Sequence, residues 1–178
     1  GFCEPSVLVP HHLNQIGLKN IVPPIATKAG KCWTNLDAFK VALYIYVDGH
    51  NAVDTKISEQ QWQQFGSTIK ALHTTDIPES IASNVPKETF SLQRCQTVKL
   101  FLERIENEVF DETVAAKLST LLKSKQEIIL DLIKRTEELG LLLQNQSFEY
   151  VLCHADMHGW NLLIDQDNHL YLIDWDTV

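Results

Sequence analysis

The sequence has no long hydrophobic run and no signal-like beginning. Its apolar stretches all fall short of the roughly 20 residues that a membrane-spanning helix needs. The first residues also lack the basic and then apolar order of a secretory signal. We therefore expect a cytoplasmic protein that does not enter a membrane.

Basic residues are outnumbered by acidic ones. The chain has 15 Lys and Arg against 23 Asp and Glu, so its formal net charge is −8 at pH 7. Proteins that bind nucleic acid are usually basic, and the composition therefore argues against a nucleic-acid partner. An acidic cleft would attract a cationic small molecule, although an acidic surface also arises from the need for solubility alone.

Cysteine is scarce and scattered. Cys3, Cys32, Cys95 and Cys153 form no Cys-x-x-Cys pair. This spacing gives neither a zinc motif nor a disulfide framework. We expect reduced, mostly buried thiols and no zinc site.

The first part of the chain is predicted to form short elements. With 178 residues, 44% of them hydrophobic, the chain can bury the core of one domain. Residues 10–17 begin with a proline and end with a glycine, which predicts a short helix. A turn is expected at 28–31. Residues 39–47 are rich in β-branched and aromatic side chains, which favours a strand.

A helix is predicted over residues 59–73. Ser58 and Gln61 have the spacing of a capping box, in which each side chain bonds the backbone of the other residue. Apolar residues recur at three- and four-residue intervals. They predict one buried face, formed by Trp62, Phe65, Ile69 and Leu72.

Two longer helices are predicted next. The first covers about residues 87–107. The second begins after Asp111, a good cap, and continues with helical apolar spacing to about residue 140, with a kink near Ser124. The charged residues of the second helix, such as Lys134, Arg135, Glu137 and Glu138, are expected to face solvent.

Near the C-terminal end, two short apolar runs flank a polar turn at residues 166–169, which predicts a β-hairpin. A loop with the pattern His154-x-Asp156-x4-Asn161 leads into the first strand, and the second strand ends at Asp174. A phosphoryl transferase needs a carboxylate for the attacking hydroxyl and oxygen ligands for magnesium. Because the hairpin returns Asp174 to Asn161, the pattern can supply both.

These residues resemble the catalytic loop and metal-binding Asp of the aminoglycoside phosphotransferase family. The run 154–161, followed by Ile173-Asp174-Trp175-Asp176, is most similar to the spectinomycin phosphotransferase branch of that family. Ala155 stands where many members have Gly. Asp176 stands where protein kinases have the Gly of Asp-Phe-Gly, which argues against kinase-style switching of this segment.

The resemblance implies an α+β, protein-kinase-like fold. Residues 1–48 would be the end of the small N-terminal lobe with its strands and hinge. Residues 49–178 would be a mainly helical C-terminal lobe that carries the catalytic hairpin. In the family, backbone groups of the hinge bind adenine, and the matching positions here are Ile45, Tyr46 and Val47.

The resemblance also implies the cofactors ATP and Mg²⁺ and a role for each motif residue. Asp156 would be the catalytic base, and Asn161 and Asp174 would be the magnesium ligands. His154 would be structural. Asp176 would support the site, either by meeting a cationic substrate or by capping the segment that follows.

Two expected parts of such an enzyme are missing. None of the seven glycines forms a Gly-x-Gly-x-x-Gly loop, and every lysine lies too late to pair with the nucleotide phosphates. The chain also stops two residues after Asp176. We therefore expect a segment of a longer protein, incomplete at both ends.

Several functions remain open from the sequence. The first is phosphorylation of a hydroxyl on a small cationic molecule, such as spectinomycin or another aminocyclitol or aminoglycoside antibiotic. The second is the same reaction on a metabolite such as choline, homoserine or a sugar. The third is a nucleotide-binding pseudokinase without activity. The sequence does not indicate an oligomeric state.

Overall fold

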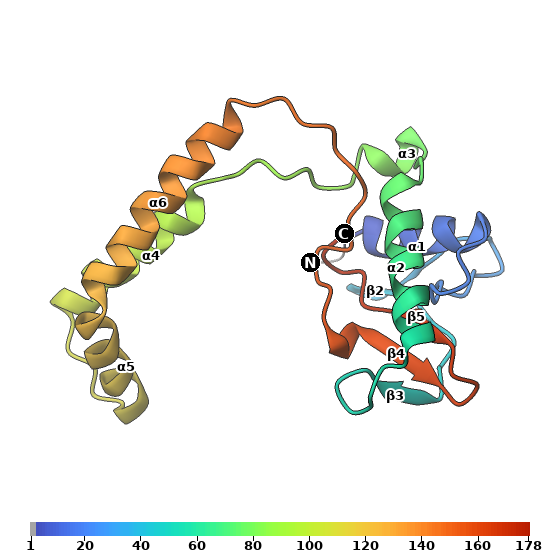
Figure 1. Ribbon diagram of the computed structural model, residues 1–178, viewed down its shortest axis with the longest axis horizontal. Helices are drawn as coiled ribbons and strands as arrows, with labels where there is room; N and C mark the ends of the chain where they lie inside the picture. The colour runs from blue at the N-terminus through green and yellow to red at the C-terminus, as the bar shows by residue number, and fades with distance from the viewer. Residues whose placement is uncertain (1–2) are drawn as a thin grey trace. The chain divides into compact units, whose positions relative to one another are not determined.

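The computed structural model describes residues 3–178, which form two compact units. The first unit combines the chain up to Pro86 with Tyr150–Val178, and the second is Lys87–Glu149 (Figure 1). The predicted hairpin strands thus belong to the same unit as the N-terminal helix. The lobe boundary expected at residue 48 stays a prediction.

The first unit contains the helices α1 (Pro5–Gln15), α2 (Glu59–Thr74) and the short α3 (Glu79–Ala82). Its strands are β1 (Thr34–Leu36), β2 (Phe39–Val41), β3 (Gly49–Asn51), β4 (Leu162–Asp165) and β5 (Leu170–Leu172), and a 3-10 turn, η1, spans Gly159–Asn161. β1 pairs with β2, and β3, β4 and β5 form a separate antiparallel sheet in that order. The predicted hairpin is therefore confirmed as β4 and β5.

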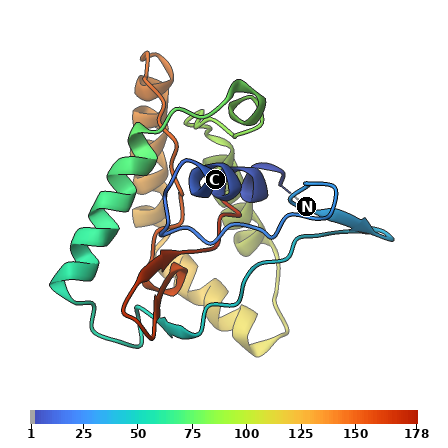
Figure 2. The ribbon, with the colours of Figure 1, turned by 90° about the vertical axis from the view of Figure 1, so that its right-hand side faces the viewer.

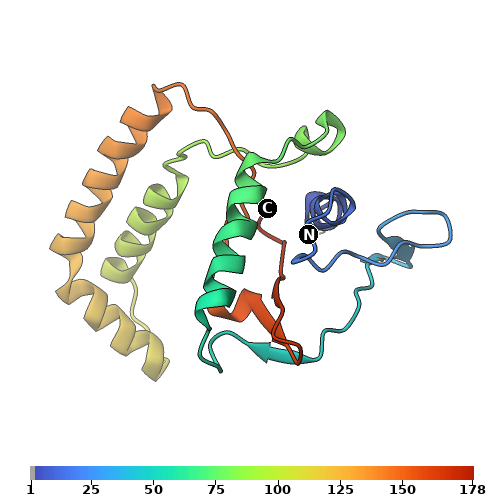
Figure 3. The ribbon, with the colours of Figure 1, turned by 45° about the vertical axis from the view of Figure 1, so that its right-hand side comes forward.

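One hydrophobic core joins the two ends of the chain. Helix α2 lies beside the sheet of β4 and β5 (Figure 3). The C-terminal end lies at α1 (Figure 2). Its buried members come from both helices, the sheet, the last residues and two connecting segments: Val9, Leu13, Ile21, Leu72, Leu152, Leu162, Leu170, Leu172, Trp175 and Val178. The segment that carries the motif is thereby fixed against α1 and α2.

Helix α1 begins five residues earlier than predicted. Pro5 fits the start of a helix because it lacks an N–H that would be unbonded there. Pro10 lies inside the helix, where it forfeits one hydrogen bond. Its ring is buried, and packing compensates for that loss. The end was predicted correctly, with Gly17 at φ 104° just beyond the helix.

The strand predicted over residues 39–47 is shorter than expected. β2 ends at Val41, and after it only Tyr44 makes an isolated bridge, to Pro24. The side chains of Ile45 and Tyr46 are 65% and 84% exposed. β-Branched and aromatic residues favour a strand only where a neighbouring strand can pair with them, and the described residues offer none here.

Helix α2 matches its prediction at both ends. The backbone N–H of Gln61 donates to Ser58 Oγ at 3.3 Å, and Ser58 N–H donates to Gln61 Oε1 at 2.8 Å, which completes the capping box. The predicted buried face is only partly correct. Leu72 is buried, but Trp62 is 53% exposed, and Gln61 and Thr68 are buried instead. Gln61 can be buried because the cap uses its side chain.

The second unit consists of α4 (Gln93–Asn107), α5 (Thr113–Ser124) and α6 (Gln126–Gln144), which pack on one another (Figure 3). Its core is small, with Cys95, Leu102 and Ile133 buried. An ion pair between Lys99 Nζ and Glu137 Oε1, at 2.7 Å, links α4 to α6.

Three details of this unit differ from the prediction. Helix α4 begins at Gln93 because residues 87–92 are irregular, with Phe90 at φ 51°. The kink expected near Ser124 is a complete break between α5 and α6. Glu112 rather than Asp111 caps α5, since its carboxylate accepts from Val114 N–H at 3.0 Å and Ala115 N–H at 2.7 Å.

Within residues 3–178, no helix has both the length and the apolar character needed to cross a membrane. Cys32 and Cys95 are buried, Cys3 is half-buried and Cys153 is exposed.

Candidate functional site

The motif lies on a loop that the backbone bends sharply at two points. Ala155 has φ 63° and Asp174 has φ 62°, both in the left-handed region. A side chain in that region costs about 1 kcal/mol relative to glycine. This explains why many family members have Gly at the first position. The strain at Asp174 turns the chain out of the sheet just after β5.

His154 connects the loop to the segment after β5. Its side chain is 1% exposed, and its Nε2 lies 2.9 Å from the carbonyl oxygen of Ile173. The Thr177 hydroxyl donates to the carbonyl of His154 at 2.8 Å, and the His154 ring lies against Trp175, with ring centroids 4.6 Å apart. Because a carbonyl only accepts, Nε2 carries the proton in this contact. The structural role predicted for His154 fits these contacts.

Burial controls the charge of His154. It lowers the pKa of the imidazole below its usual 6.5, and the nearby His158 lowers it further. The bond to Ile173 and the carboxylates of Asp156 and Asp174 act in the opposite direction but do not outweigh burial. His154 is therefore neutral at pH 7. Its Nδ1 is buried without a hydrogen-bond partner among the described residues.

Asn161 holds Asp156 in place. Its Nδ2 donates to the backbone carbonyl of Asp156 at 2.9 Å and to Asp156 Oδ2 at 3.0 Å. Asn161 is 5% exposed, so its amide has one fixed orientation. The carbonyl of Asn161 accepts from Ile173 N–H at 3.0 Å, which brings the residue before Asp174 beside it. The structure thus brings together Asp156, Asn161 and the backbone that presents Asp174.

His158 also belongs to this group, although the sequence pattern did not single it out. Its Nε2 lies 3.4 Å from Asp156 Oδ2 and 3.4 Å from Asn161 Nδ2. A histidine in a polar loop is ordinary, and only its position two residues after Asp156 could have pointed to it.

The residues present fit a magnesium ion. Both hydrogens of Asn161 Nδ2 are used on Asp156, which leaves Asn161 Oδ1 as a free acceptor within the described part of the chain. Asp174 is exposed and its carboxylate makes no hydrogen bond with the described residues. One amide oxygen and one carboxylate, open to water and phosphate, are the donors that Mg²⁺ prefers.

The predicted hinge residues are extended and outside any strand. The antiparallel bridge between Pro24 and Tyr44 engages the backbone of Ile45, whereas within residues 3–178 no backbone hydrogen bond engages Tyr46 or Val47. Burial raises the pKa of the adjacent Tyr44, and the charge of Asp176 raises it further. Asp176 therefore lies near the start of the hinge segment. The unpaired backbone groups of the hinge remain available to a ligand.

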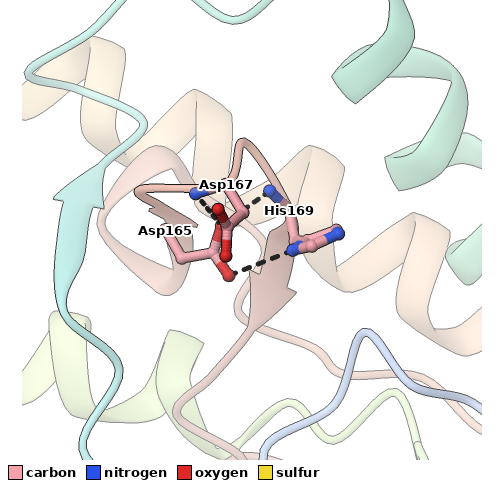
Figure 4. Close-up of side chains that lie close together, drawn as sticks. All are labelled: Asp165, Asp167 and His169. Carbon is pink, nitrogen blue, oxygen red and sulfur yellow. Dashed lines mark hydrogen bonds and ion pairs between the residues drawn. The ribbon is translucent and has the colours of Figure 1, made fainter.

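A second acidic group, Asp165, Asp167 and His169, sits in the turn between β4 and β5 (Figure 4). Asp165 Oδ1 accepts from the N–H groups of Asp167 and His169 at 2.9 and 2.8 Å. Its Oδ2 lies 3.2 Å from both His169 Nδ1 and the Tyr171 hydroxyl. Both oxygens of Asp165 are thus committed to the turn, and the group shapes the hairpin.

A surface groove of about 600 Å³ lies between residues 17–20 and one side of α2. Its lining is rich in amides, including Asn20, Gln60 and Gln63. It contains none of the motif residues, so it is separate from the candidate site.

The comparison with protein families decides the assignment. The model of the phosphotransferase enzyme family, abbreviated APH, matches residues 11–178. The chain belongs to this family. The comparison with curated protein sequences gave no significant match.

Two crystal structures of spectinomycin phosphotransferase, APH(9)-Ia, are similar to this APH-family chain. One is an AMP complex, with 29% identity and a TM-score of 0.87, covering 99% of this chain and 56% of the enzyme. The other contains ADP and spectinomycin, with 29% identity and a TM-score of 0.87, covering 99% of this chain and 54% of the enzyme. The chain spans about half of their length. The predicted resemblance and its α+β, kinase-like fold are confirmed.

Proposed function

We propose that the protein transfers the γ-phosphate of ATP to a hydroxyl of a small cationic molecule, an aminocyclitol or aminoglycoside such as spectinomycin. The observation that carries this proposal is the clamp between Asn161 and Asp156. One amide donates twice to Asp156 and keeps its oxygen free, while its backbone carbonyl binds the residue before Asp174. The proposed base and one proposed metal ligand, Asn161, are thus hydrogen-bonded to each other, and the second proposed ligand, Asp174, directly follows a residue bonded to Asn161.

Asp156 orients the acceptor hydroxyl and receives its proton. Asn161 uses Asp156 Oδ2, which leaves Asp156 Oδ1 free of hydrogen bonds from the described residues. A hydroxyl bonded to Oδ1 would have its oxygen lone pairs directed at the phosphorus of the nucleotide. As the oxygen–phosphorus bond forms and the bond to the ADP oxygen breaks, the hydroxyl proton moves to Oδ1. Positioning and charge account for most of the rate in such transfers.

Asn161 Oδ1 and the Asp174 carboxylate would hold Mg²⁺. When bound, the ion neutralises charge that develops on the phosphate oxygens. The bond from Ile173 N–H to the Asn161 carbonyl keeps the two ligands next to each other. Asp174 follows β5 in a left-handed turn, and its side chain is exposed.

The nucleotide would lie against the hinge. Of the hinge residues Ile45, Tyr46 and Val47, the last two leave their backbone polar groups unpaired with the described residues, which suits recognition of an adenine edge. Backbone recognition does not depend on side-chain identity, so these positions can carry exposed apolar residues. The related enzyme was crystallised with AMP and with ADP.

Three observations favour a cationic acceptor. The net charge is −8, Asp176 is exposed with no hydrogen bond to the described residues, and the related enzyme binds spectinomycin. Charge-assisted hydrogen bonds to ammonium groups contribute about 1.5–3 kcal/mol each. Added salt should therefore raise the KM for the acceptor more than it lowers kcat.

Phosphorylation of a metabolite such as choline, homoserine or a sugar is the second candidate, since the catalytic residues are the same for each. A pseudokinase is disfavoured because Asp156, Asn161 and Asp174 are all present. An ADP-release assay of the full-length protein separates these functions. It would compare aminocyclitols and aminoglycosides with choline, homoserine and neutral sugars. Release with the cationic antibiotics supports the proposal, and release with no acceptor supports the pseudokinase.

A further inference from the structure

We propose that His158 is a positioning residue for Asp156. It would donate a hydrogen bond from Nε2 to Asp156 Oδ2 and so direct the other carboxylate oxygen toward the acceptor hydroxyl. This inference rests on the proposed function, because it gives Asp156 the part of the base. It concerns a residue that the motif pattern alone does not assign.

The proton count at Asn161 excludes a hydrogen bond from Asn161 to His158. An amide nitrogen has two hydrogens. Asn161 Nδ2 directs one to the Asp156 carbonyl at 2.9 Å and one to Asp156 Oδ2 at 3.0 Å. No hydrogen is left for His158, although its Nε2 lies 3.4 Å from that nitrogen. His158 Nε2 therefore does not accept from Asn161, and Asp156 Oδ2 lies within ion-pair distance of it, at 3.4 Å; the proposal places the ring proton on Nε2, facing that oxygen.

Asp156 Oδ2 would then accept from two donors that both follow it in the motif loop, Asn161 Nδ2 and His158 Nε2. Two donors fix the rotation of a carboxylate more firmly than one, because rotation about its last bond would break both contacts. The contact at 3.4 Å is long for a hydrogen bond, as is common at catalytic carboxylates before substrate binds. With Oδ2 committed, the acceptor hydroxyl meets Oδ1.

Backbone hydrogen bonds fix the turn that carries His158. The carbonyl of His158 accepts from Asn161 N–H at 3.0 Å, which closes the 3-10 turn η1. The side chain of Asn51, in β3, donates to the carbonyl of Trp160 at 2.6 Å, and Ala52 N–H donates to the carbonyl of Gly159 at 3.1 Å. Strand β3 and the residue after it thus hold the turn from outside, so its position does not depend on the His158 side chain.

The His158 side chain is half-exposed, at 46%, and belongs to neither hydrophobic core. Removing it should leave the protein folded. The chain provides a matched control in His169, which is 60% exposed and has its Nδ1 3.2 Å from a carboxylate oxygen of Asp165, in the hairpin turn. Each histidine has a ring nitrogen within ion-pair distance of an aspartate, His158 inside the motif and His169 outside it.

The kinetic test compares His158→Ala, His158→Gln and His169→Ala in the full-length protein. We expect His158→Ala to lower kcat about tenfold, the value of one hydrogen bond to a charged group. The KM values for ATP and acceptor, and the melting temperature, should change little. His158→Gln should recover part of kcat because its amide can donate from a similar position, and His169→Ala should match the wild type.

A kcat for His158→Ala within about twofold of the wild type would overturn the proposal, as would a loss confined to KM. A glutamine variant as impaired as the alanine variant would also contradict it. Nitrogen NMR of the imidazole rings gives a reading that needs no activity. We expect His158 as the Nε2–H tautomer, perturbed by Asp156→Ala while His169 is not. An unperturbed His158 refutes the contact even if the protein transfers no phosphate, an outcome that would count against the proposed function separately.

Discussion

The Nε2 of His154 lies 2.9 Å from the carbonyl oxygen of Ile173, and this contact joins the two halves of the candidate site. His154 comes two residues before the proposed base, and Ile173 comes one residue before a proposed metal ligand. A second bond, from the Thr177 hydroxyl to the His154 carbonyl, repeats the connection at 2.8 Å. The buried histidine therefore holds the loop of the proposed base against the segment that carries the proposed metal ligand.

Asp156→Asn should keep nucleotide binding and lose most of the turnover. Asparagine keeps an acceptor for the Asn161 amide but cannot take the proton of the acceptor hydroxyl. A general base contributes about 10²–10⁴-fold to the rate, and kcat in the full-length protein should fall by that factor. Asp167→Asn, in the exposed hairpin turn, is the control and should stay active. Near-normal kcat in Asp156→Asn would remove Asp156 from its role.

Asp174→Ala should weaken magnesium-dependent ADP binding more than Asn161→Ala, because only the first change removes a formal negative charge. Asn161→Ala should in addition lower kcat, since it frees the Asp156 carboxylate. Calorimetric titration of ADP with and without Mg²⁺ measures both effects. If Mg²⁺ increased the affinity for ADP equally in the wild type and in Asp174→Ala, the metal would bind elsewhere.

His154 should make stability depend on pH. Burial lowers the pKa of His154 in the folded state below the usual 6.5, which the unfolded chain keeps. The unfolded state therefore binds more protons between these two values, and stability falls as pH drops below 6.5 until the folded pKa is reached. Urea unfolding of the wild type and His154→Phe, between about pH 5 and 8, tests this. The free energy of unfolding of the variant should depend less steeply on pH than that of the wild type. Identical pH dependence in the two proteins would contradict this role of His154.

Gly49→Ala should destabilise the protein. A Cβ at Gly49 would lie 2.8 Å from the backbone carbon of Ile164, the neighbour of its partner residue in β4. Backbone cannot move aside as a side chain can, so we expect a loss of about 1–3 kcal/mol. Gly66 in α2 has nothing within 4 Å of such a Cβ. Gly66→Ala should instead add about 0.5–1 kcal/mol by helix propensity. Urea unfolding distinguishes the two, and a neutral Gly49→Ala would contradict the pairing of β3 with β4.

The sequence was sufficient for the hairpin at the candidate site because the geometry of this segment is local. The pattern from His154 to Asp174 folds as one loop and one hairpin, and two-residue alternation of Leu162 and Ile164 defines the buried side of that hairpin. The sequence did not indicate His158, because its contact with Asp156 depends on how the two amide hydrogens of Asn161 are used. The spacing of residues in the sequence does not show this. The hinge stays a prediction, since its unpaired backbone groups would acquire partners only from a ligand.

The fold was predicted less well where contacts between distant segments determine the bounds and the buried faces of helices and strands. Pro10 indicated a helix start, but burial of its ring allows it inside α1. The strand after β2 ended early because it lacked a partner among the described residues. Trp62 has the right spacing for the buried face of α2, yet the capping box places Gln61 there instead. In each case a contact between segments far apart, or a cap, outweighed local preference.

The measurement that tests the central claim most directly is phosphate transfer by the full-length protein, supplied with ATP, Mg²⁺ and spectinomycin. Coupled ADP release and the mass of the product would be followed together. We predict ADP release that depends on spectinomycin, a product heavier by one phosphoryl group, and loss of both in Asp156→Asn. Efficient phosphorylation of a neutral sugar with every aminocyclitol ignored would contradict the cationic substrate. Failure to phosphorylate any hydroxyl compound of the panel would contradict the phosphotransferase itself.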